Sequence, residues 1–151
     1  MDADFCFLFG SSHAPESCRA AVVEALEKCY AEHNIRCFVV GGYGNFDSIG
    51  ISSLREFKKI YGDIVLLLLT PYHPYVRPVD PPRDFDGTYY PPGQEDALPQ
   101  YAIVKANEFC IKNCAAAICY PSGVGNTRKL YEKIQKRKIP IYNLKENESR
   151  P

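Results

Sequence analysis

The sequence has no tryptophan, a single methionine and no net charge, since 18 acidic residues balance 18 basic ones. Balanced charge gives no whole-chain argument for a polynucleotide or an anionic membrane as partner. The longest apolar run, residues 64–69, is far shorter than the roughly 20 residues that span a bilayer. We therefore expect no membrane partner, and one domain over residues 1–144 with a solvated tail over 145–151.

The C-x-x-C spacing of zinc sites is also missing, although the chain contains 7 cysteines. An odd number, with most members inside apolar runs, does not suit a disulfide framework. We expect reduced, buried thiols, no metal site and no cofactor. The acidic start of the chain, Met1 to Asp4, does not resemble a secretory signal, so a cytoplasmic location is expected.

Short apolar runs alternate with segments of helical periodicity, which indicates a parallel sheet with crossover helices. We predict an α/β fold, a Rossmann-like three-layer sandwich of about five mainly parallel strands with helices on both faces. The hydrophobic run 64–69 is expected in the centre of the sheet, and Pro140 indicates an edge strand. Strands are expected at residues 5–9, 37–40, 64–69, 116–120 and 139–142, and helices at 15–33, 47–61, 98–113 and 123–138.

The segment 71–99 interrupts this alternation and holds most of the 12 prolines. Loops of this length in a compact domain are functional or disordered, and the aromatic residues here argue for order. We interpret the segment as a lid, with Tyr72, His73 and Tyr89 as candidates to contact a base. The alternatives are a small core within the loop or a protein interface, where tyrosine is enriched.

Glycine clusters follow the first, second and fourth predicted strands, where ligands bind in open α/β sheets. Each cluster leads into a predicted helix, whose first N–H groups attract anions. The alternative is that each glycine only makes a tight turn between a strand and a helix. Neither G-x-G-x-x-G nor the P-loop spacing is present. The candidate phosphate-binding residues are Gly10, Ser11, Gly41, Gly42, Gly44, Ser122, Gly123, Gly125, Asn126 and Thr127.

Three other polar groups lie in the loops predicted at the edge of the sheet. Asp47 follows the second one, where it would accept from a ribose hydroxyl, hold the loop through backbone N–H groups, or simply cap the helix. His13 and His73 are candidates for ligand contact, and neither has a nucleophile motif beside it. The basic residues near 128–138 suit a helix C-terminus, so we expect no nucleic-acid partner.

The order GGYGNFD at 41–47, LLLTPYHP at 67–74, AIVKAN at 102–107 and ICYPSGVGNT at 118–127 resembles the SLOG superfamily. This Rossmann-like group includes the lonely-guy phosphoribohydrolases and the DNA-processing protein DprA, and the chain is most similar to its small stand-alone bacterial branch. The resemblance implies a nucleotide pocket over these loops, to which Asn107 contributes, and a homodimer or higher homo-oligomer.

The chain departs from the hydrolases of that group. Alanine occupies position 106, where members commonly carry arginine, and the loop PSGVGNT continues into Arg128 and Lys129 instead of acidic residues. Cleavage of an N-glycosidic bond needs a carboxylate near the anomeric carbon. We therefore expect binding of a small phosphorylated, nucleotide-like ligand without turnover. The alternatives are a nucleosidase acting on nucleoside monophosphates, with Asp47, Glu132 or an acidic residue of the 71–99 loop as its acid, and an adaptor that binds proteins through the tyrosine-rich loop.

Overall fold

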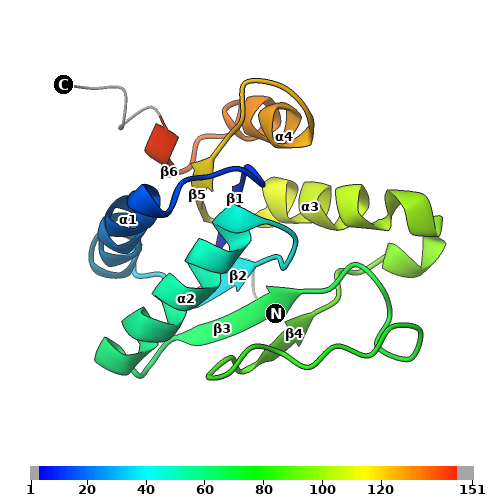
Figure 1. Cartoon of the computed structure of the whole chain (residues 1–151), viewed down its shortest axis with the longest axis horizontal. Coiled ribbons are helices and arrows are strands. Elements are labelled where there is room, and N and C mark those ends of the chain that lie inside the picture. Colours follow the sequence, from blue (N-terminus) through cyan, green and yellow to red (C-terminus); the bar gives the residue numbers. More distant parts are fainter. Residues whose placement is uncertain (1–3, 146–151) are drawn as a thin grey trace.

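The computed structural model describes residues 4–145, which form one sheet of six parallel strands in the order β4-β3-β2-β1-β5-β6 (Figure 1). The strands are β1 (Phe5–Gly10), β2 (Cys37–Val40), β3 (Val65–Leu69), β4 (Gly87–Tyr89), β5 (Ala116–Tyr120) and β6 (Ile141–Asn143). The helices are α1 (Arg19–Glu32), α2 (Asn45–Ile60), α3 (Ala102–Asn113) and α4 (Asn126–Ile134), with 3₁₀ turns η1 (Glu16–Cys18), η2 (Gln94–Asp96) and η3 (Pro99–Tyr101). The predicted Rossmann-like sandwich is confirmed.

Both faces of the sheet are covered because alternate residues of its strands point to opposite sides. Cys6 and Leu8 of β1 lie in a core shared with α1 and α2. Phe5, Phe7 and Phe9 of the same strand pack with residues of α3 and α4. A strand buried on both faces reads as a continuous apolar run, which is why β1 could be located in the sequence.

Two strand predictions were wrong. The sheet has a sixth strand, β4, inside the segment 71–99 that was interpreted as a loop. It pairs with β3 in parallel from Leu67 and Gly87 to Leu69 and Tyr89. The hydrophobic strand β3 is consequently second from an edge instead of central, and its Val65 is exposed. The predicted edge position of the last strand, β6, is confirmed.

The helix boundaries also differ at the glycine loops. Helix α4 was predicted from residue 123 but begins at Asn126, because Gly125 has φ 88° and ψ −161°, a conformation close to glycine-only. Helix α2 was predicted from residue 47 but begins at Asn45, with Gly44 at the N-cap position. Of the predicted tail, only Lys145 lies within the described residues.

The chain order places a topological switch point at β1. After β1 the chain moves outward through β2 and β3 on one side, and it returns to β5 on the other. The loops that follow β1, β2 and β5 therefore meet at one edge of the sheet, where this topology opens a crevice. Across residues 4–145, no helix has the length and hydrophobicity needed to cross a bilayer.

Candidate functional site

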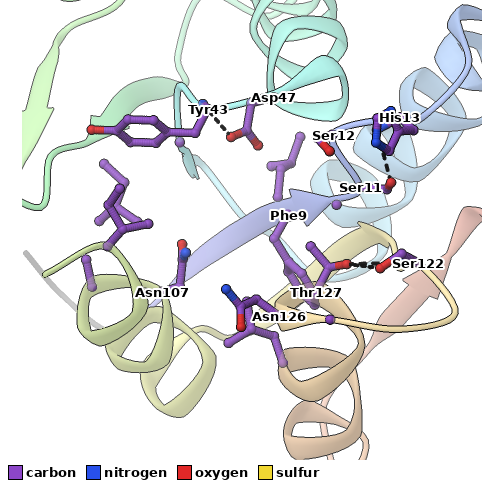
Figure 2. Close-up of a pocket in the computed structure, with 18 of the residues that line it drawn as sticks. Phe9, Ser11, Ser12, His13, Tyr43, Asp47, Asn107, Ser122, Asn126 and Thr127 are labelled. Carbon is purple, nitrogen blue, oxygen red and sulfur yellow. Dashed lines mark hydrogen bonds between the residues drawn. The ribbon is translucent and has the colours of Figure 1, made fainter. Parts of the chain in front are cut away.

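A cavity of about 420 Å³ lies at this edge, over the carboxyl ends of β1, β2 and β5 (Figure 2). Its walls come from the loops after these strands, from α3 and from the start of α4. Nine of the predicted ligand-binding residues line it: Gly10, Ser11, Gly41, Asp47, Asn107, Ser122, Gly125, Asn126 and Thr127. We call this space the main cavity. Its volume falls in the range of ordinary small-molecule sites, roughly 300–1,000 Å³.

Ser11 joins the three loops that frame the main cavity. Its N–H donates to the carbonyl of Tyr120 at 2.8 Å, and its own carbonyl accepts from the N–H of Phe46 at 3.3 Å. The Ser11 hydroxyl oxygen accepts from the N–H of His13 at 3.0 Å. Gly44 packs so close to this loop that an added Cβ would lie 3.0 Å from Cα of Ser12. The rim is thus a set of interlocked turns, which holds its backbone groups in place.

Asp47, which lines the main cavity, holds the loop after β2 through a hydrogen bond. Its Oδ2 accepts from the N–H of Tyr43 at 2.9 Å. It is the third residue of α2, so the N-cap interpretation was wrong and the loop-holding one is confirmed. An added Cβ at Gly41 would lie 3.1 Å from the same Oδ2, so the carboxyl group leaves little space there. Burial raises the pKa of Asp47 to about 6, against the lowering effect of that hydrogen bond.

This pKa gives Asp47 a measurable effect on stability. The folded protein holds the Asp47 proton more tightly than the unfolded chain does, so this contribution is present at pH 4 and is lost as the pH rises through about 6. The variant Asp47→Asn keeps an acceptor for Tyr43 but cannot ionise. We expect the stability of the wild type relative to Asp47→Asn to fall by about 2 kcal/mol between pH 4 and pH 7. Urea unfolding at both pH values measures it, and parallel pH profiles would contradict the assignment.

The loop 121–125 closes on itself through two hydroxyl groups (Figure 2). The Ser122 hydroxyl donates to the carbonyl of Val124, and the Thr127 oxygen accepts from the Ser122 N–H at 3.2 Å. Because the Ser122 hydroxyl proton is already donated to the Val124 carbonyl, the Thr127 hydroxyl is the donor in the 2.6 Å contact between the two hydroxyl groups. These side chains therefore brace the loop, whereas the sequence favoured them as donors to a phosphate.

Besides the side chains of Ser12, His13 and Tyr43, the donors that line the main cavity without a hydrogen-bond partner among residues 4–145 are backbone N–H groups and two carboxamides. Within residues 4–145, the N–H groups of Asn126, Thr127 and Arg128 have no recorded acceptor, as expected for the first turn of a helix. The carboxamides of Asn107 and Asn126 have no recorded partner in the same range, and both line the cavity (Figure 2). No lysine or arginine within that range lines it. An anion here would depend on neutral donors and on the dipole of α4.

His13 also lines the main cavity, whereas the remaining candidates do not. Gly42 and Tyr72 line a smaller side cavity of about 160 Å³, and Gly123 lines a third one. Tyr89 packs in the core beside Phe5 and Phe109. His73 stacks on Tyr75 within the 71–99 segment. The three residues proposed to contact a base are therefore not placed against the main cavity.

Sequence reasoning missed much of the apolar lining. Ile103 and Ala106 reach the cavity from α3, and Pro71 reaches it from the end of β3. Tyr43 and Val124 stand at its rim, 56% and 81% exposed. A signal was present for these last two, because each is a large side chain between glycines of a predicted ligand loop. The α3 residues had no such signal, since only the packing of α3 brings them to the edge.

No family model matches the chain, and no curated protein matches it either. Among residues 4–145, no three His, Cys, Asp or Glu side chains are grouped in a way that could hold a metal ion. The chemistry of the main cavity is therefore argued from its own groups: a polar rim of backbone and amide donors, one carboxyl group with a raised pKa, and an apolar floor.

Proposed function

We propose that the main cavity binds a small phosphorylated ligand of the nucleotide class. The observation that carries this proposal is the position of the α4 N-terminus, whose unpaired N–H groups and the Asn126 carboxamide stand at the wall of a cavity of about 420 Å³. A phosphate group satisfies several such donors at once and is stabilised by the helix dipole. The resemblance to SLOG proteins supports the same class of ligand and, with it, a homo-oligomer.

The other walls of the main cavity suit the base and the sugar of a nucleotide. Phe9, Leu69 and Ile103 line it with apolar surface, which favours a flat, weakly polar group such as a base. The Asp47 carboxyl and the Asn107 carboxamide also line the cavity and suit the hydroxyl groups of a sugar (Figure 2). The ligand would thus lie with its phosphate at α4 and its sugar between α2 and α3.

The first test is mass spectrometry of small molecules released by heat from the freshly purified protein. We expect a nucleotide at near-stoichiometric amount, and calorimetric titration with AMP then measures the affinity directly. Ribose 5-phosphate and adenosine serve as fragments, and both should bind more weakly than AMP. Failure of AMP and of every released compound to bind would overturn the proposal.

A second candidate function, a nucleosidase, is favoured by one observation. The Asp47 carboxyl lines the main cavity with a pKa raised to about 6, which suits a general acid near neutral pH. Glu132, the other acid considered, does not line the cavity. Release of adenine from AMP, abolished in Asp47→Asn, would establish this activity. Intact recovery of AMP after prolonged incubation would exclude it for this substrate.

A further inference from the structure

A second cavity, of about 390 Å³, lies on the other side of the 121–125 loop from the main cavity. Ser122 lines both, so the loop is the partition between them. This second cavity has no role in the function proposed above. We call it the basic cavity, because Arg128 and Lys145 line it and no acidic residue of the described chain does.

Arg128 stands where an arginine is electrostatically unfavourable. It is the third residue of α4, at the positive end of the helix dipole, and the first turn of this helix has no acidic residue. Within residues 4–145, no carboxylate oxygen lies within 4.0 Å of its guanidinium, and its one recorded contact is the ring of Tyr131 at 5.4 Å. By contrast, Arg36 and Arg55 each form an ion pair with an aspartate. Within the described chain, Arg128 thus forms no ion pair that offsets its charge.

The hydroxyl group of Tyr131 supplies a second, independent indication. Tyr131, only 7% exposed, lines the basic cavity. Its oxygen accepts from the Gln135 side-chain amide at 2.9 Å, which leaves the Tyr131 O–H free to donate. No acceptor for this proton is recorded within residues 4–145. An oxygen of an anion bound in the basic cavity would accept this proton.

We infer that the basic cavity is a second anion-binding site, built for a phosphate group. The planar guanidinium of Arg128 offers two parallel N–H donors to a pair of phosphate oxygens, and the Tyr131 hydroxyl offers a third donor. The phosphate has two possible sources. It is either the second phosphate of the ligand in the main cavity, crossing the 121–125 loop, or a separate phosphate.

The test uses the full chain labelled with ¹⁵N and titrated with inorganic phosphate, read amide by amide in NMR spectra. We expect saturable shifts at Gly123, Gln135 and Asn143, and a half-saturation concentration about tenfold higher in Arg128→Gln. The matched control is Lys129→Gln, the same charge change one residue on, at a side chain that lines neither cavity. The spectra themselves report whether each variant is folded. The inference would be overturned if the half-saturation concentration of phosphate rose equally in both variants, or if phosphate caused no shifts at these amides.

A comparison of AMP with ADP separates the two sources of the phosphate. If the site takes the second phosphate of the main-cavity ligand, ADP binds about tenfold more tightly than AMP, and Arg128→Gln removes this advantage. If it takes a separate phosphate, AMP and ADP bind alike and inorganic phosphate still shifts Asn143 in protein saturated with AMP. Absence of AMP shifts at Asn107 would count against the proposed function alone, because the phosphate titration reads the basic cavity independently.

Discussion

Replacing Asn126 with aspartate is expected to weaken AMP binding about 100-fold without lowering the melting temperature. The two side chains have the same shape, but aspartate brings a negative charge to the wall of the main cavity. Two unit charges 4 Å apart near a protein surface repel by about 4 kcal/mol, so a loss of about 3 kcal/mol is reasonable. The first position of α4 favours a negative charge, and folding should not suffer. Calorimetric titration and a thermal melt measure both quantities.

The chain provides a matched control for this variant in Asn45→Asp. Asn45 is the first residue of α2, as Asn126 is of α4, but its side chain does not line the main cavity. We expect AMP affinity to change less than threefold in Asn45→Asp. An equal loss of AMP affinity in both variants would mean that AMP binding responds only to the overall charge of the protein. No loss in Asn126→Asp would place the phosphate elsewhere.

Gly10→Ala is expected to lower the melting temperature by about 5–10 °C. The added Cβ would lie 2.5 Å from Cγ of Phe46, a side chain with no exposed surface. Overpacking of this kind costs about 1–3 kcal/mol, and 1 kcal/mol shifts the melting temperature of a chain of this size by roughly 2–4 °C. Thermal unfolding followed by circular dichroism measures the change.

Gly62→Ala is the control for this substitution. Gly62 has no atom within 4 Å of its added Cβ, and its φ is not positive, so the melting temperature should stay within about 1–2 °C of wild type. If Gly10→Ala behaved like this control, Phe46 would be free to move. A glycine would then be required at position 10 only for ligand binding. The packing instead indicates that Gly10 leaves space for Phe46 of α2.

The sequence predicted the strands that are mostly buried between the two layers of helices. Strands β1, β2, β3 and β5 are apolar runs because both faces of the sheet are covered. Strand β4 gives no such run, since its three residues are only half-buried and prolines surround it. Its position depends on a distant contact: the Asp86 carboxylate accepts from the Leu66 N–H at 2.8 Å, and the Asp86 N–H donates to the Leu66 carbonyl.

The site was predictable to a similar degree. The three glycine loops could be assigned to one edge because parallel strands end at the same edge, and nine candidates line the main cavity. The tyrosines of residues 71–99 could not be placed, because their positions follow from packing. Tyr89 is half-buried against Phe5, while Tyr75 is 94% exposed. Likewise, the unpaired charge of Arg128 becomes visible only when the carboxylates around it are known.

The two edge strands restrict how copies of this protein can associate. Strands β4 and β6 have 3 residues each, and prolines border both: Pro91 and Pro92 follow β4 closely, and Pro140 precedes β6. Proline cannot donate to a neighbouring strand, and an edge this short offers few free backbone groups. Growth of the sheet from one molecule into the next, the first step of many amyloid-like aggregates, is therefore blocked at both ends. We therefore expect an ordered homo-oligomer to form through helices and loops.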